Sequence, residues 1–248
     1  MSRKVWVKTG ALLSVFMMMA HSSFAHVRNY VWTEQYQTLP EGGFEVESWA
    51  TFKVPDGNRT NKNTIQYQEE LEYGVTDHWT IAHYERWKTK NVVGPDDSTF
   101  YEGFKFESKY RFGEKGKHWV DPLLYLELKT DVREKRNVNK VEGKIVLSKD
   151  FGKTNITYNQ IMESEVDNGG RTEHEFAVGT NYEILPDLHA GVEFTGQYWN
   201  PEGRHNEISM GPTLAYEHSY FWVAAGGLFG LNRAADDKQV RIIIGIPF

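Results

Sequence analysis

The chain has 248 residues, a formal net charge of −6 and no cysteine. Without cysteine it forms no disulfide and no thiolate metal site, and its acidic balance argues against nucleic acid as a partner. Beyond the first 25 residues, no apolar run reaches the roughly 20 residues that a membrane-spanning helix needs. If the chain crosses a membrane, it does so with strands, whose lipid-facing side contributes only alternate residues.

The first 25 residues have the layout of an export signal. Arg3 and Lys4 precede an apolar run over 11–20, and Ser23 and Ala25 are small at the two positions that a signal peptidase reads. This pattern predicts a signal peptide over 1–25 that is cleaved before His26, and hence an exported protein, which the strand pattern below places in the bacterial outer membrane. The alternative, a membrane anchor, is disfavoured because ten apolar residues fall short of the roughly 20 required.

Residues 26–42 show no period and precede the first predicted strand. Tyr30, Trp32 and Tyr36 stand beside Glu34 and Gln35, so the segment is amphipathic. Two interpretations stay open at this stage. The segment is either a lead-in that folds into a barrel as a plug or a disordered periplasmic tail.

A strand pattern then runs through residues 43–248 as a single domain. Segments of alternating apolar and polar residues are separated by turn chemistry rich in Gly, Asn, Asp and Pro, which predicts strands. The predicted strands are 43–54, 63–75, 79–90, 99–112, 118–130, 137–149, 154–164, 172–184, 188–199, 205–216, 220–230 and 238–248.

The connections alternate in length. Those after even-numbered strands are short, as at 76–78 and 185–187, and those after odd-numbered strands are mostly longer, as at 55–60 and 200–204. Short periplasmic turns, longer extracellular loops and an even strand number are typical of outer-membrane barrels. We therefore predict an all-β, single antiparallel transmembrane β-barrel of about twelve strands, with both termini on the periplasmic side.

Each strand has an apolar and a charged face. Phe44 and Val46 alternate with Glu45 and Glu47, for example, and only the parity of 79–90 stays open. The predicted lumen carries these acids: Glu45, Glu47, Glu70, Glu72, Glu107, Asp121, Glu127, Glu142, Glu163, Glu173, Glu175, Glu193, Glu207 and Glu217. It carries these bases: Lys53, Lys105, Lys109, Arg111, Lys129, Lys144 and Arg241. Such charges must pair or be hydrated, so the lumen is either salt-bridged and dry or a wet passage.

Aromatic residues cluster where strands meet turns. The predicted girdle near the short turns includes Trp79, Trp119, Tyr182, Tyr216 and Trp222, and a smaller set flanks the long loops. Two such rows match the interfacial girdles of membrane barrels. A soluble β-sandwich also alternates, but its strands are usually shorter than these.

The last strand has one wholly apolar face, formed by Val240, Ile242, Ile244, Ile246 and Phe248. An exposed edge of this kind invites aggregation in water, whereas closure onto the first strand removes it. A terminal Phe behind alternating apolar residues resembles the C-terminal signature of bacterial outer-membrane β-barrels. That resemblance implies recognition by the barrel-assembly machinery.

Two further motifs carry a family resemblance. The stretches 38–47, with Leu39-Pro40-Glu41-Gly42, and 73–79, with Gly74-Val75-Thr76-Asp77, resemble uncharacterised transporter-like outer-membrane barrels near the putative MetA-pathway phenol-degradation family. In that group a Leu-Pro-x-Gly lead-in enters the first strand, and a Gly-x-Thr-Asp turn follows the second strand. The resemblance implies the fold and the compartment but no named solute.

No catalytic or metal motif stands out. The chain lacks the His-x-Ser-Asn-Gly stretch in which barrel lipases resemble one another, and its nine histidines show no metal spacing. His205 with Glu207, and the acidic pairs Asp96-Asp97 and Asp236-Asp237, fall at predicted outer loops, where acids can bridge divalent cations to lipopolysaccharide. We expect neither a cofactor nor a metal. We expect the barrel to be surrounded by outer-membrane lipid and lipopolysaccharide.

The leading function is passive or weakly selective diffusion of small polar solutes. The acid excess of the predicted lumen favours cations. The alternative is a closed structural or surface-interaction barrel, and a barrel enzyme is third. Twelve strands lie between the roughly 8 that fill their own interior and the roughly 16 that leave an open channel, so strand number does not decide.

Overall fold

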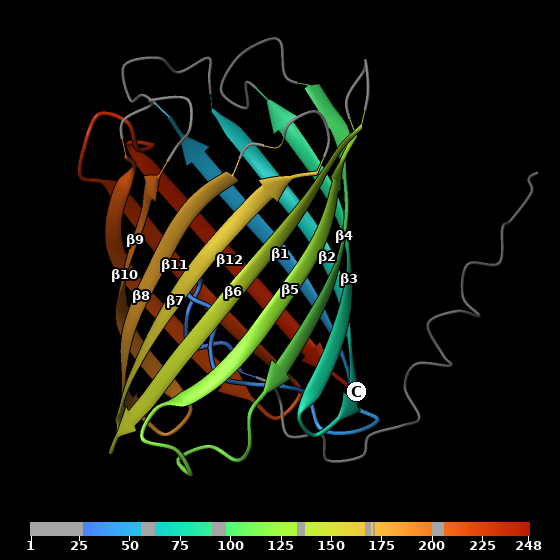
Figure 1. Ribbon diagram of the computed structural model, residues 1–248. Helices are drawn as coiled ribbons and strands as arrows, with labels where there is room; N and C mark the ends of the chain where they lie inside the picture. The colour runs from blue at the N-terminus through green and yellow to red at the C-terminus, as the bar shows by residue number, and fades with distance from the viewer. Residues whose placement is uncertain are drawn as a thin grey trace, which may run out of the picture.

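The computed structural model describes residues 27–55, 63–90, 98–132, 137–166, 170, 172–199 and 206–248. They form a closed antiparallel barrel of twelve strands (Figure 1). The strands are β1 (Phe44–Val54), β2 (Thr64–Thr76), β3 (Trp79–Lys90), β4 (Ser98–Arg111), β5 (Asp121–Asp131), β6 (Val138–Phe151), β7 (Thr154–Glu165), β8 (Thr172–Leu185), β9 (Leu188–Trp199), β10 (Ile208–His218), β11 (Phe221–Gly230) and β12 (Lys238–Pro247). The predicted signal peptide lies outside the described residues.

The first and last strands close the barrel. β1 pairs with β12 from Glu45↔Pro247 to Val54↔Lys238, and Phe248 N donates to Phe44 O at 2.9 Å. Val240, Ile242, Ile244 and Ile246 are 42–51% exposed on the outer face. The all-β, twelve-stranded antiparallel barrel expected from the sequence is therefore confirmed, and strand ends differ from the predicted ones by three residues at most.

Starts that differ by three residues occur at β5 and at β10, and the one before β5 has a visible cause. The sequence predicts a strand from 118, but residues 112–120 form a turn, with Gly113 and Gly116 at φ 84° and 80°. The carboxylate of Asp121 holds this turn by accepting the Gly116 N–H at 2.9 and 3.0 Å. Trp119 consequently stands in the turn, 89% exposed.

The alternating faces separate an apolar outer surface from a polar interior. Large apolar side chains such as Leu124, Leu126 and Leu128 are about half exposed on the outside. In β3, whose parity the sequence left open, Thr80, Ala82 and Tyr84 are buried and face inward. No helix in the described ranges is long and apolar enough to cross a membrane.

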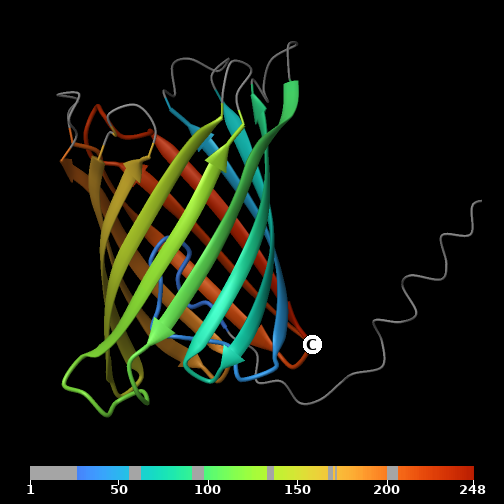
Figure 2. The ribbon, with the colours of Figure 1, turned by 45° about the vertical axis from the view of Figure 1, so that its right-hand side comes forward.

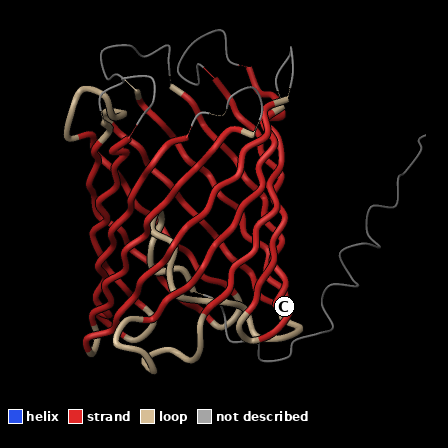
Figure 3. Tube along the Cα trace, in the orientation of Figure 1, coloured by secondary structure: helices blue, strands red, loops and turns tan. Residues whose placement is uncertain are grey.

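An inner segment, residues 27–40, occupies the lumen. Figures 1 and 2 show it as the blue chain within the barrel, in the half nearer the tight turns, and Figure 3 shows it as a loop inside the red wall. Tyr30 is 1% and Leu39 0% exposed. The segment therefore lies inside the barrel and does not form a periplasmic tail.

Candidate functional site

The polar interior contains the charged residues that the sequence assigned to the lumen. Glu45, Glu47, Glu70 and Glu72 are at most 2% exposed, and the register sets Glu45 opposite Glu72 and Glu47 opposite Glu70. The other assigned residues are buried or partly buried on the same inward faces: Lys105, Glu107, Glu127, Lys129, Glu142, Lys144, Glu175, Glu193 and Arg241. Because isolated buried charge is costly, these groups need partners.

Arg28 of the inner segment supplies a partner to several acids at once. Its Nε lies 2.9 Å from Glu47 Oε1 and its Nη1 3.4 Å from Glu34 Oε2. Its Nη2 lies 3.6 Å from Glu72 and 3.8 Å from Glu70. Burial opposes the charge of Arg28, but the attraction of Glu47, Glu34 and Glu70 outweighs burial and raises its pKa well above the usual value.

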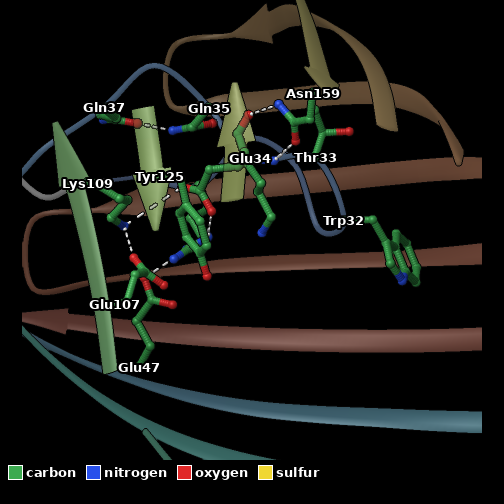
Figure 4. A network of polar contacts seen from close by, with 12 residues as sticks. Trp32, Thr33, Glu34, Gln35, Gln37, Glu47, Glu107, Lys109, Tyr125 and Asn159 are labelled. Carbon is green, nitrogen blue, oxygen red and sulfur yellow. Dashed lines mark hydrogen bonds and ion pairs between the residues drawn. The ribbon is translucent and has the colours of Figure 1, made fainter. Parts of the chain in front are cut away.

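Lys109 is the second cation of this region, and its side chain is fully buried. Its Nζ lies 2.7 Å from Glu72. It also lies 3.1 Å from Glu107 and 3.8 Å from Glu34, both labelled in Figure 4. The hydroxyl of Tyr84 donates to Glu107 at 2.5 Å. We call Arg28, Lys109 and their carboxylates the acidic cluster: Glu34, Glu45, Glu47, Glu70, Glu72 and Glu107. Acids outnumber bases in it.

Carboxylate oxygens of this cluster come close enough together to suggest a cation site. Those of Glu45, Glu47 and Glu72 lie within 4.8 Å of one another, as do those of Glu70, Glu72 and Glu107. Arg28 and Lys109, however, form ion pairs with these same acids. The two side chains supply cationic charge at both triads, so we assign no metal to them.

A ladder of charges continues around half of the wall. Five glutamates stand directly opposite one another across β4–β8: Glu107, Glu127, Glu142, Glu163 and Glu173. Like charges in facing positions repel, and a row of lysines two residues along the strands offsets them. Lys105 lies 3.0 Å from Glu127, and Lys129 and Lys140 both pair with Glu163.

The facing wall is apolar and holds the inner segment by packing. Val27 and Val31 contact a buried cluster that includes Ala215, Ala224 and Ile243. Trp222 belongs to this cluster and is 0% exposed, so its predicted place in the lipid-facing girdle is wrong. Its ring faces inward over Gly245, where a Cβ would stand 2.1 Å from it. The other four predicted girdle residues are 41–89% exposed: Trp79, Trp119, Tyr182 and Tyr216.

Glycines in the wall make room for the aromatic rings of the segment. A Cβ on Gly179 would stand 2.4 Å from Tyr30 Cε1, and one on Gly226 would stand 2.8 Å from Trp32 Cζ3. The Tyr30 hydroxyl donates to Asn155 Oδ1 at 2.7 Å, and burial raises its pKa. Any larger residue at these two wall positions would collide with the segment.

Glu193 of β9 fixes the tip of the segment. Its carboxylate accepts the backbone N–H groups of Val31, Trp32 and Thr33 at 2.7, 2.8 and 2.5 Å. Asn159 of β7 accepts from Glu34 N and donates to Glu34 O, at 2.6 and 2.8 Å. The backbone polar groups at the tip of the segment are thus satisfied by the wall, as buried groups require.

The two motifs quoted for the family resemblance contact each other where the segment leaves the lumen. Gly42 N donates to Gly74 O at 2.8 Å, and Gly74 N donates to Gly43 O at 2.9 Å. A Cβ on Gly74 would stand 2.0 Å from Pro40 O, so position 74 requires glycine. Asp77 accepts from Glu41 N through its carboxylate at 2.9 Å. The lead-in and the β2–β3 turn therefore form one structural unit.

Three cavities along the lumen are lined in part by the inner segment. A cavity of about 420 Å³ toward the long loops includes Trp32, Lys53 and Arg241 in its lining. A second of about 150 Å³ also touches Trp32 and Arg241, and is lined by residues 28, 31, 33 and 34 as well. A third of about 270 Å³ is lined by Asn29, Gln35, Tyr36 and turn residues of the other end. Residues 28–35 separate the third cavity from the first two.

Several functional residues escaped the sequence analysis. Arg28 and Glu34 were not assigned to the lumen, and Tyr84 and Arg86 of β3 had no assigned face. The spacing of apolar residues predicts the strands of the barrel wall but not the segment inside the barrel. The one sequence signal for that segment was the amphipathic composition of 30–40. Of the candidate chemical pairs, His205 and Asp96-Asp97 lie outside the described residues, while Asp236 and Asp237 lie in the loop before β12.

Comparison with known proteins agrees with the barrel. The chain resembles an outer membrane channel from Pseudomonas putida F1, with a TM-score of 0.60 and 11% identity over 88% of this chain and 100% of that one. At so low an identity the likeness concerns the fold alone. The outer-membrane barrel resemblance inferred from the sequence motifs is confirmed at that level.

Two other solved barrels score lower. The translocator domain of the autotransporter NalP from Neisseria meningitidis has a TM-score of 0.48 and 8% identity over 86% of this chain and 91% of that one. Outer membrane phospholipase A from Escherichia coli has a TM-score of 0.44 and 11% identity over 84% of this chain and 93% of that one. We infer nothing from these two likenesses. No family model matches the chain, and no curated protein matches it in sequence.

Proposed function

We propose that this protein is an outer-membrane channel for small polar solutes whose lumen the inner segment closes. The observation that carries the proposal is the division of the lumen. Cavities of about 420 and 150 Å³ stand on one side of residues 28–35, and one of about 270 Å³ stands on the other. Movement of the segment would join them into one passage, so the segment acts as a gate.

The outer surface supports a place in the outer membrane. Apolar side chains such as Leu126, Ile145 and Ile244 are 42–52% exposed on the wall, which suits contact with lipid. Export through a signal peptide over 1–25, contact with lipopolysaccharide and assembly through the last strand belong to the same proposal. The barrel-assembly machinery would recognise the strand that ends at Phe248.

The lining of the lumen defines the class of solute. Lysine, arginine, glutamate, glutamine and threonine side chains line the cavities, and a charged wall favours hydrated, polar molecules over apolar ones. The acidic cluster adds a preference for cations, because five of its carboxylates belong to the wall and only one of its bases, Lys109, does. Rings of acidic side chains favour cations in channels.

The second candidate is a permanently closed structural or surface-interaction barrel. One observation favours it: the segment is bound to the wall by the ion pair of its Arg28 with Glu47 and by three backbone hydrogen bonds to Glu193. A segment fixed so well could serve stability alone. A barrel enzyme is the third candidate, and no grouping of side chains within the described residues favours it.

Solute flux into proteoliposomes tests the proposal. We compare the wild-type protein with a variant that lacks residues 27–38, using uncharged sugars and small ions as solutes. The channel predicts low flux for the wild type and several-fold higher flux for the deletion. Because the deletion also removes Arg28 from among the buried acids, a Gly179→Val variant, which displaces Tyr30 without changing charge, is measured beside it. If both folded variants are as tight as the wild type, the closed barrel is the better description.

A further inference from the structure

The largest of the three cavities has the size of a small-molecule site. It measures about 420 Å³, within the roughly 300–1,000 Å³ that ligand pockets occupy. It opens toward the long-loop end, above the tip of the inner segment. Its apolar lining includes Trp32, Ile161 and Leu228, and its sides carry charges of both signs.

One side of this cavity is basic. Lys53 of β1 and Arg241 of the neighbouring β12 line it. Arg241 donates through Nε to Thr51 Oγ1 and through Nη1 to Val31 O, both at 2.8 Å, and its guanidinium lies 5.3 Å from the ring centroids of Trp32 and Trp49. These contacts orient the guanidinium, and no carboxylate of the described residues lies within ion-pair distance of it.

The other side of the cavity is acidic. Glu173 and Glu175 of β8, with Glu207 before β10, line it. Glu173 accepts from Gln197 Nε2 at 2.9 Å, whereas the carboxylate of Glu175 has no hydrogen bond or ion pair with any described residue. β8 and β1 stand five positions apart in the closed order of twelve strands, so the acidic and basic sides face each other across the lumen.

This lack of close ion pairs distinguishes the cavity from the rest of the lumen. Elsewhere each interior cation has a carboxylate within 4 Å: Arg28, Arg86, Lys88, Lys105, Lys109, Lys129, Lys140 and Lys144. Lys53 and Arg241 are the two inward cations without such a partner among the described residues, and both line this cavity. Partly desolvated charges without partners are costly, and a ligand of complementary charge would compensate them.

We propose that this cavity binds small zwitterions whose two charges are well separated, with short peptides as the ligand class. The ligand carboxylate would bind Lys53 and Arg241, its ammonium group would bind Glu175, and an apolar side chain would rest on Trp32. A short peptide suits the site better than a single amino acid because the two charged sides lie across the lumen. The inference rests on the proposed channel in that it names the solutes that the channel would take up.

Three peptides that share one sequence and differ at their termini test the site. The probes are Gly-Phe-Gly, its N-acetyl form, which lacks the ammonium group, and its C-terminal amide, which lacks the carboxylate. Binding is measured by calorimetry on the full protein in detergent. Since a hydrogen bond to a charged group contributes enough for about a tenfold change in affinity, we expect the free peptide to bind about tenfold more tightly than either modified form.

Two variants then assign the charges. Lys53→Met should remove the advantage of the free peptide over the amide, and Glu175→Gln should remove its advantage over the N-acetyl form. The control variants are Lys153→Met and Glu183→Gln, which break a 3.1 Å ion pair in the turns at the other end and should leave all three affinities unchanged. Circular dichroism and heat-modifiable gel migration establish that each variant is folded.

The outcomes separate this site from the channel itself. Equal binding of the three peptides, no binding of any, or a ranking that neither variant changes would overturn the site. If the peptides rank as expected but neither the wild type nor the folded Gly179→Val variant passes solute in liposomes, the site would stand and the channel would be overturned. Flux without discrimination among the peptides would do the reverse.

Discussion

Gly179 lies directly beneath the ring of Tyr30, so that a Cβ at position 179 would stand 2.4 Å from Tyr30 Cε1. The two partners differ in stiffness. Gly179 belongs to β8, which is paired with β7 on one side and β9 on the other, whereas Tyr30 belongs to a segment without strand pairing. A side chain added at 179 should therefore displace the segment rather than the wall.

The first prediction is that Gly179→Val opens the lumen. Overpacking costs about 1–3 kcal/mol where a core cannot yield, and here the inner segment can yield. We expect several-fold higher single-channel conductance in planar bilayers, with unchanged strand content. Gly143→Val is the matched control, because a Cβ at Gly143 of β6 meets no atom within 4 Å. Equal conductance of the two variants would show that Tyr30 does not block the passage.

The second prediction concerns Glu193, whose carboxylate accepts three successive N–H groups at 2.5–2.8 Å. Glu193→Gln replaces one acceptor oxygen by a donor, which leaves buried N–H groups without partners. Each lost bond to a charged group costs about 1.5–3 kcal/mol, so the amides of 31–33 should exchange with solvent tenfold faster or more. Hydrogen exchange measures this, with Glu183→Gln as a control near the end of β8, where Glu183 pairs with Lys153. Unaltered protection would mean that packing alone holds the tip.

The third prediction is that acid loosens the segment through Glu34. Burial opposes the charge of this carboxylate, but Arg28 and Lys109 outweigh burial and lower its pKa from 4.5 to about 2. A lowered pKa stabilises the seated segment above about pH 4.5, and this stabilisation is lost as the pH falls toward about 2, at roughly 1.4 kcal/mol per unit of pKa shift.

Conductance should accordingly rise as the pH is lowered through this window. The wall acids that face Glu34, such as Glu72, take up protons as well, so a variant must isolate its share. Glu34→Gln should flatten the part of the profile that belongs to Glu34, while Glu41→Gln, in the exposed end of the lead-in, should leave the profile as in the wild type. Identical profiles for the two variants would contradict a role for Glu34.

The barrel could be predicted from the sequence because its determinants are local. Alternation in β1 and β12 and the tight turns around Asp77 and Asp187 each follow from a few neighbouring residues. The failures involve non-local contacts. Trp222 has the composition of a girdle residue, yet it faces inward because Gly245 of the next strand leaves room for its ring.

For the candidate site, the wall residues could be predicted from local patterns, but their partners in the inner segment could not. Strand parity places Glu47 and Glu193 in the lumen, but no local pattern tells that Arg28 would bind one and the backbone of 31–33 the other. These partners lie 19 and about 160 residues apart. The inward face of β3 could not be predicted because both of its faces carry polar residues. On the outward face, His83 and Glu85 pair with each other at 3.0 Å.

The last prediction is that opening the channel strengthens its preference for cations. A displaced segment carries Arg28 and Glu34 away together, so the wall keeps Glu45, Glu47, Glu70, Glu72 and Glu107 against Lys109. A low-dielectric wall focuses the field of these acids and concentrates cations.

Reversal potentials across a salt gradient should shift further toward the cation limit in Gly179→Val than in the wild type. The shift should fade as salt rises, since the Debye length is about 10 Å at 0.1 M. Glu107→Gln in the Gly179→Val background should weaken the preference, because it removes a carboxylate of the wall and leaves Lys109 in place. An anion-selective open channel would show that the acids of β1–β4 do not line the passage.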